Sequence, residues 1–204
     1  MQGQGWNLAV PSAYYRPRSR AKVGNYDDTA FVAADYAAGR IASVSVTYVR
    51  DLLVDSGDPL PLQAGSVSSL KDLGKPNLIA RYLAGRRDGD PLGLQPPRSD
   101  VLNANRVSDT ELSFQLLTLK ETATSQTTSA PGARRTLART LLVPGAGVLV
   151  TAWATSDIEG AVCEAQPCKA CGSLRCDCPP PKCSAPPDER DQLDERIVSS
   201  LQLR

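Results

Sequence analysis

The chain has 204 residues, enough to bury a sizeable core, and this length favours one domain with an appendage over two separate domains. Its 23 basic residues nearly balance its 22 acidic residues and only 5% of its residues are aromatic, so composition points neither to nucleic acid nor to an anionic membrane as a partner. The chain contains no histidine, which excludes a histidine general base, Ser-His-Asp and Cys-His nucleophile systems, and every metal site with a histidine ligand.

The amino-terminal segment predicts a short edge strand followed by a basic loop. Residues 6–10 alternate apolar and polar side chains and end at Pro11. The loop is interpreted either as an exposed segment whose rings cover the sheet edge or as a docking patch for an acidic partner, since interfaces favour Arg and Tyr. The docking candidates are Tyr14, Tyr15, Arg16, Arg18, Arg20 and Lys22.

Targeting and membrane signals are not found in the sequence. The amino terminus lacks the basic and apolar regions of a signal peptide. No apolar run approaches the roughly 18 to 20 residues that span a bilayer. We therefore expect either a cytosolic protein or a mature chain whose targeting segment has been removed.

Two strands and a helix are predicted next. The strands cover residues 29–34 and 41–50, and the second alternates apolar side chains with Ser and Thr. A loop over residues 51–65 leads to a short helical turn in residues 66–73. The helix covers residues 76–87, with Pro at its first position and Arg in its last turn. The residues expected to point inward are Val67, Leu70, Leu73, Leu78, Ile79, Tyr82 and Leu83.

Residues 110–155 predict three consecutive antiparallel strands, and a candidate strand over 101–107 leads into them. In the first of the three, Leu112, Phe114 and Leu116 alternate with polar residues, which is typical of a half-buried strand. A polar loop over 122–134 precedes the second strand, 136–143. A Pro-Gly-Ala-Gly turn then leads into the third. Connections this short join antiparallel neighbours, so we expect a meander.

The last part of the chain is expected to be a Cys/Pro-rich insertion followed by a closing helix. Residues 160–187 hold all six cysteines. The helix opens at Asp188, and acidic residues occupy its first turn, where the helix dipole favours them. Leu193, Ile197 and Leu201 recur every four residues and predict an apolar stripe that packs on the sheet.

The cysteines, namely Cys163, Cys168, Cys171, Cys176, Cys178 and Cys183, allow three interpretations. Three disulfides, the leading one, would stabilise a loop without a core by about 2 to 4 kcal/mol each. A zinc site on four thiols is chemically reasonable, although the C-x-x-C and C-x-C pairs lie closer together than in a usual zinc ribbon. A dithiol redox site is the third, although its C-x-x-C normally opens a helix in a βαβ unit. Disulfides would place the chain in an oxidising compartment: secretory, periplasmic or lumenal.

Three short patterns carry a resemblance to a known family. They are Gly5-Trp6-Asn7-Leu8-Ala9-Val10-Pro11-Ser12, Leu70-Lys71-Asp72-Leu73-Gly74-Lys75-Pro76 and Arg196-Ile197-Val198-Ser199-Ser200-Leu201. Together with the strand at 41–49 and the meander, they make the chain resemble the PsbP-like proteins of the thylakoid lumen over residues 5–160 and 188–204. The Cys-rich insertion has no counterpart in that pattern.

The resemblance implies an α+β fold, an α-β-α sandwich on a central antiparallel sheet, as a single domain over residues 1–204 with the insertion at 160–187. It also implies a non-catalytic protein of the chloroplast thylakoid lumen, its transit peptide cleaved, that docks on photosystem II or photosystem I as an extrinsic, stabilising or assembly subunit. We expect no cofactor, no metal site, no nucleic-acid partner and no membrane insertion of its own. The alternative is a Cys-rich zinc-binding or thiol-redox module on the same scaffold.

Overall fold

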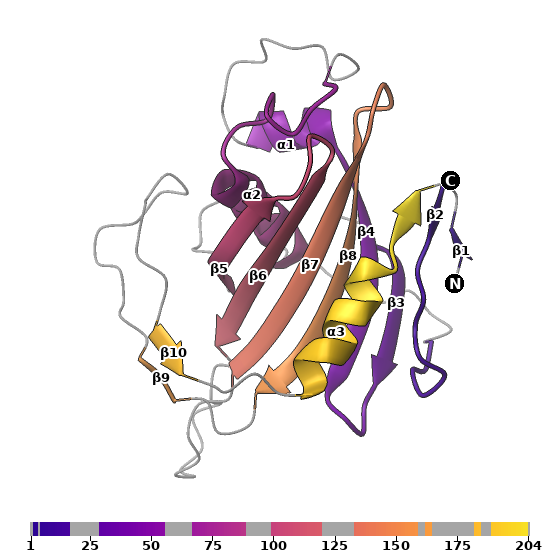
Figure 1. The fold of residues 1–204 in the computed structure, drawn as a ribbon, viewed down its shortest axis with the longest axis vertical. Coiled ribbons are helices and arrows are strands. Elements are labelled where there is room, and N and C mark those ends of the chain that lie inside the picture. Colours follow the sequence, from indigo (N-terminus) through magenta and orange to yellow (C-terminus); the bar gives the residue numbers. More distant parts are fainter. Residues whose placement is uncertain are drawn as a thin grey trace.

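The computed structural model describes residues 2–3, 5–16, 29–55, 67–88, 99–119, 133–158, 162–164, 182–184 and 189–203. At its centre lies a six-stranded sheet with the order β3-β4-β8-β7-β6-β5, in which all neighbours are antiparallel (Figure 1). Its strands are β3 (Thr29–Asp35), β4 (Arg40–Tyr48), β5 (Ser99–Arg106), β6 (Glu111–Leu119), β7 (Ala133–Val143) and β8 (Val148–Ile158).

The predicted meander is confirmed as β6, β7 and β8. The ladder between β7 and β8 runs without interruption along both strands. In the turn between them, Gly145 and Gly147 have φ angles of 77° and 59°, which glycine adopts more easily than other residues. The strand β7 begins three residues earlier than expected. Arg134, which the sequence placed in a polar loop, instead pairs with Asp157 of β8, with 2.8 Å between Nε and Oδ1.

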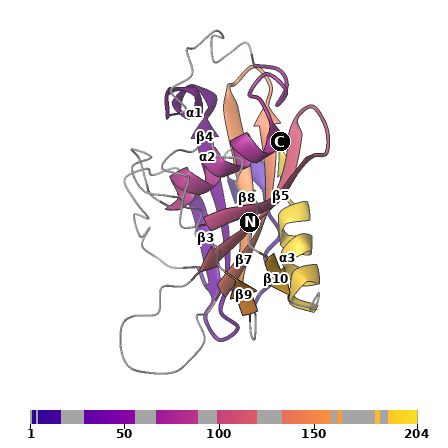
Figure 2. The same cartoon turned by 90° about the vertical axis from the view of Figure 1, so that its left-hand side faces the viewer.

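Helices cover both faces of the sheet, so the fold is mixed α/β on a mostly antiparallel sheet (Figure 2). The helix α2 (Pro76–Asp88) packs on β5 and β6, and α3 (Glu189–Ser199) packs on β8 and β7. In the ranges that the structure describes, no helix combines the length and the apolar character needed to cross a membrane.

The core beneath α2 is built from large side chains. The apolar stripe predicted for this helix is confirmed, with Ile79, Tyr82 and Leu83 buried. They pack with Phe114 of β6 and Trp153 of β8, whose rings meet edge to face at 5.5 Å between centroids. Such aromatic pairs stabilise a fold by about 0.5 to 1.5 kcal/mol beyond their area burial.

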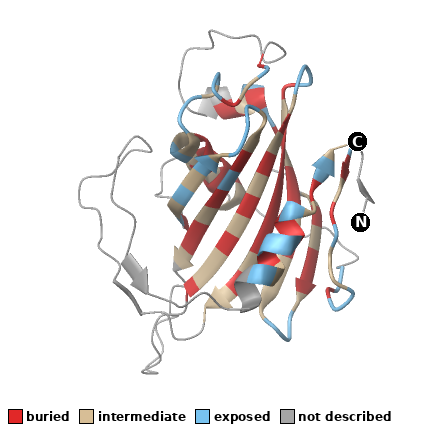
Figure 3. Ribbon diagram, in the orientation of Figure 1, coloured by how far each residue is buried: buried red, intermediate tan, exposed pale blue. Residues whose placement is uncertain are grey.

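The core beneath α3 is built on small side chains of β8. Ala152 and Ala154 are fully buried there, which allows the helix to approach the strand closely. The predicted stripe is confirmed, because Ile197 and Leu201 are buried and Leu193 packs partly buried against the same cluster. Figure 3 shows the outward face of α3 exposed.

Both ends of the described chain meet in a second, three-stranded sheet of order β1-β2-β11. Here β2 (Trp6–Asn7) pairs with β1 (Gln2–Gly3) and with β11 (Gln202–Leu203) (Figure 1). The strand expected over residues 6–10 is therefore shorter than predicted. The following residues Leu8 and Tyr14 are buried with Trp6 and Phe31 in the core beneath α3.

Two predicted elements differ from the structure. The strand expected over residues 41–50 ends at Tyr48, and the helix α1 (Val49–Asp55) follows where a loop was expected. Val49 and Leu52 are buried in the core beneath α2, so the one-turn spacing of these two residues stabilises α1. Within the described residues 67–73, hydrogen-bonded turns surround Leu70, and Leu70 is buried as expected.

Candidate functional site

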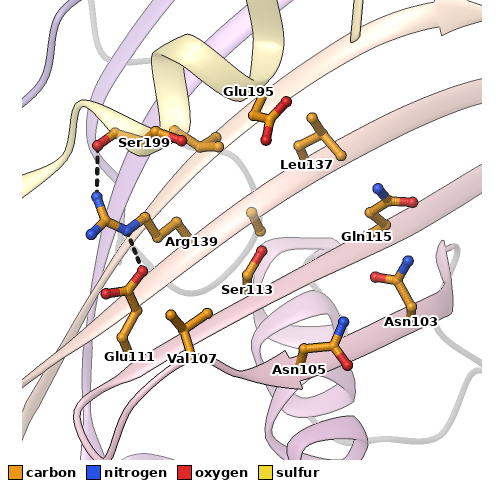
Figure 4. Close-up of a pocket in the computed structure, with 12 residues that line it drawn as sticks. Asn103, Asn105, Val107, Glu111, Ser113, Gln115, Leu137, Arg139, Glu195 and Ser199 are labelled. Carbon is orange, nitrogen blue, oxygen red and sulfur yellow. Dashed lines mark hydrogen bonds and ion pairs between the residues drawn. The ribbon is translucent and has the colours of Figure 1, made fainter. Parts of the chain in front are cut away.

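An open polar groove of about 450 Å³ lies on the sheet beside α3 (Figure 4). Its floor comes from β5, β6 and β7, and the last turns of α3 form one wall. The polar side chains that line it are Asn103, Asn105, Glu111, Ser113, Gln115, Arg139 and Glu195, with Ser199 at the end of the helix.

The groove follows from the alternation of β6. Its apolar residues face α2, which leaves Ser113 and Gln115 on the opposite face. The register then extends the polar surface across the neighbouring strands. Asn105 pairs with Ser113 and Asn103 pairs with Gln115. Because α3 packs mainly on β8 and β7, these cross-strand pairs remain beside the helix rather than beneath it.

Arg139 fixes the wall of the groove. Its Nε donates to Oε1 of Glu111 at 2.8 Å, and its Nη1 donates to the carbonyl oxygens of Ser199 at 2.7 Å and Leu201 at 2.9 Å. A cation at the carboxyl end of a helix satisfies terminal carbonyl groups and complements the dipole. Arg139 therefore ties α3 to the sheet, and the amides of Asn103, Asn105 and Gln115 line the groove together with Ser113 and Glu195.

These amide side chains determine what the groove can do chemically. An Asn or Gln side chain offers both donors and an acceptor, and it carries no charge. A groove floor of this kind suits hydrogen bonding to neutral polar groups. The groove therefore supplies a surface of hydrogen-bond donors and acceptors.

Three exposed side chains near the edge of β3, those of Tyr15, Arg16 and Tyr36, are together called the edge patch. Tyr15 forms an isolated bridge to Ala34 of β3, with backbone N···O distances of 2.7 and 2.9 Å. Its side chain is 57% exposed, and that of Tyr36, in the turn after β3, is 73% exposed. Arg16 is exposed and lies with its guanidinium carbon 5.7 Å from the ring centroid of Phe31.

The docking candidates of the basic loop divide into three groups. Tyr15 and Arg16 are exposed, as a docking role requires. Tyr14 is only 8% exposed and belongs to the core beneath α3, so little of its side chain is accessible to a partner. The other three candidates, Arg18, Arg20 and Lys22, lie outside the described residues.

The environment of Tyr14 is polar as well as buried. Burial is the main cause that raises the pKa of its phenol to about 12, and the charge of Asp194 on α3 raises it further. The guanidinium of Arg40, at the start of β4, acts in the opposite direction. The hydroxyl of Tyr14 therefore keeps its proton to a higher pH than that of an ordinary tyrosine, while the ring packs in the core beneath α3.

Two of the six cysteines lie in described strands. Cys163 is in β9 (Val162–Glu164) and Cys183 is in β10 (Lys182–Ser184), and the two strands pair with each other. The remaining four cysteines lie outside the described residues. Among the residues that the structure does describe, no group of three or more His, Cys, Asp or Glu side chains is placed to hold a metal ion.

The sequence indicated part of this arrangement and not the rest. The alternation of Glu111, Ser113 and Gln115 was visible as a polar face, but its position beside α3 depends on where that helix packs. Tyr36 belongs to the edge patch only because Tyr15 pairs with β3. No local sequence pattern predicts this pairing. Comparison with protein-family models and with curated protein sequences gave no match for this chain.

Proposed function

We propose that this chain is a non-catalytic protein of the thylakoid lumen that docks on a membrane photosynthetic complex, photosystem II or photosystem I, as an extrinsic, stabilising or assembly subunit. The sequence patterns that resemble the PsbP-like proteins support this proposal. The antiparallel sheet with helices on both faces agrees with the α-β-α sandwich that the resemblance implies. In this proposal the fold is a rigid platform that presents binding surfaces.

The observation that carries the proposal is the edge patch. Tyrosine and arginine are the residue types that contribute most to binding energy at protein interfaces. Tyr15 and Tyr36 are the two most exposed of the tyrosines that the structure describes. Arg16 follows Tyr15 directly in the sequence. An aromatic and basic surface of this composition suits an acidic patch on a partner protein.

The edge patch is also held in place before binding. Two backbone hydrogen bonds join Tyr15 to Ala34 of the central sheet. Arg16 lies over the ring of Phe31, which is only 5% exposed and therefore fixed in the core. A surface that is already ordered loses less conformational entropy when a partner binds, so more of the contact energy remains as affinity.

The experiment compares the purified full chain with a Tyr15→Ala/Tyr36→Ala variant in binding to isolated photosystem II and photosystem I particles. The substitutions remove the exposed rings and leave the backbone bonds of Tyr15 intact. We expect binding at least about tenfold weaker, since each interface anchor contributes more than about 1 kcal/mol. We also expect the affinity of the unmodified chain to fall as salt rises, because the patch includes Arg16 beside the basic loop.

Tyr48→Ala is the matched control. Tyr48 is 47% exposed and has an arginine, Arg50, with its guanidinium carbon 5.1 Å from the ring centroid, but it lies at the opposite end of β4 from Tyr36. This variant should bind as the unmodified chain does. Equal binding by all three proteins would remove the edge patch from the docking surface, and no binding of the unmodified chain to either particle would contradict the docking function itself.

A further inference from the structure

The two strands that flank the Cys-rich segment place two cysteines opposite each other. In the antiparallel pair β9–β10, Lys182 is the partner of Glu164, Cys183 of Cys163, and Ser184 of Val162. The cysteines are therefore the central pair of the three, flanked by a paired residue on each side. Six cysteines can pair in fifteen ways, and fixing the pair Cys163–Cys183 leaves three of them, because the other four cysteines can pair in three ways.

The spacing that this register imposes fits a disulfide. Residues directly opposite in an antiparallel pair have Cα atoms about 4.5 or about 5.5 Å apart, according to whether they share hydrogen bonds. Disulfides join cysteines whose Cα atoms are about 4.4 to 6.8 Å apart. Either kind of opposed pair thus lies within the range of Cα separations that a disulfide spans.

The pair also encloses the other four cysteines in the sequence. The strand β9 begins four residues after β8 ends at Ile158, and β10 ends five residues before α3 begins at Glu189. All four other cysteines fall between Cys163 and Cys183 in the sequence. We propose that Cys163 and Cys183 form a disulfide, which closes residues 163–183 into a covalent loop.

The bond forms by thiol–disulfide exchange. The two thiols release two protons and two electrons as the S–S bond forms, and the oxidant is a disulfide of the glutathione or thiol-oxidoreductase class, which is reduced to two thiols. One cysteine thiolate attacks that disulfide to give a mixed disulfide, and the second cysteine thiolate then displaces the oxidant's remaining thiol. This inference goes beyond the proposed docking function and does not depend on it.

The sequence allows the pair to be identified directly. Glu164 separates Cys163 from Cys168, and Lys182 separates Cys178 from Cys183. The full chain, secreted into an oxidising compartment, is denatured with a thiol-alkylating reagent and digested without reduction by trypsin and a glutamate-specific protease. We expect one linked species that contains residues 160–164 and a peptide beginning at Cys183, and reduction should split it into the two. Alkylated Cys163 or Cys183, or a link from either to another cysteine, would overturn the proposal.

Counting free thiols in variants under denaturing conditions gives a second test that does not depend on folding. The Cys163→Ser/Cys183→Ser variant should have the same number of free thiols as the unmodified chain, because both partners of one bond are removed together. Each single variant should have one more. If the two cysteines bonded to others, the double variant would gain two free thiols or gain a new bond between the two released cysteines, which the peptide map detects, and if both were reduced it would lose two free thiols.

Discussion

At the scale of single residues, long polar side chains join elements that are far apart in the sequence. Arg139 links β6 to the carboxyl end of α3, and Arg87 links α2 to the sheet by donating to Thr136 at 3.0 Å and to Ser99 at 2.8 Å. Charge-assisted hydrogen bonds of this kind contribute more than neutral ones. The positions of the helices on the sheet therefore depend on a few identifiable side chains.

Replacing Arg139 with alanine should lower the free energy of unfolding by about 2 kcal/mol. The change removes the partner of the Glu111 carboxylate and leaves two carbonyl groups at the end of α3 without their donor. Urea denaturation followed by circular dichroism measures the loss. Arg50→Ala is the control, since Arg50 is 68% exposed and pairs with its neighbour Asp51 at the surface, and it should cost less than about 0.5 kcal/mol. Equal losses would contradict the role given to Arg139.

The ionisation of Tyr14 makes the free energy of unfolding depend on pH in the alkaline range. Its pKa is raised from 10.0 to about 12, so between these values the folded state keeps a proton that the unfolded state has released. The free energy of unfolding therefore falls as pH rises from about 10 to about 12. Tyr14→Phe keeps the ring and lacks the ionisable group, so it should lose less stability over this range than the unmodified chain does. Urea denaturation at a series of pH values measures the difference between the two proteins.

At the scale of elements, period-2 and period-4 patterns predicted most of the strands and both long helices. The alternation in β6 and β8 and the stripe of α3 are local properties of the sequence, which is why they could be recognised without a structure. The helix α1 was missed because Val49 continues the apolar character of β4, and only its packing beside Leu52 separates the two elements. The bridge between Tyr15 and Ala34 and the register of Cys163 with Cys183 are contacts between distant segments, which local patterns cannot encode.

The packing of α3 on the sheet can be tested with Ile197→Ala. Ile197 is 2% exposed and packs in the core beneath α3, so the substitution should lower the free energy of unfolding by about 2 to 4 kcal/mol. Glu195→Ala changes an exposed position of the same helix and should cost less than about 0.5 kcal/mol. Denaturant titration of both variants measures the contrast, and a small effect of Ile197→Ala would place α3 away from the sheet.

At the scale of the whole molecule, the central sheet separates two cores that differ in composition. The core beneath α2 holds the large aromatic residues, and the core beneath α3 includes the amino-terminal segment with Trp6, Leu8 and Tyr14. That segment continues directly into the edge patch. The proposed docking surface is thus anchored by the same core that holds the closing helix in place, so losing α3 from the sheet should also disturb docking.

The small sheet of β1, β2 and β11 brings the two ends of the described chain together, which bears on circular permutation. Trp6 of β2 is opposite Gly3 of β1 on one side and Leu203 of β11 on the other, so β2 lies between the first and last described strands and is antiparallel to both. A short linker could join them, and new ends could be opened at the exposed turn around Gly145, without changing any strand neighbour in the central sheet. Circularly permuted versions of these 204 residues should therefore reach the same architecture, and a label attached at either end of them would report from the same side of the molecule.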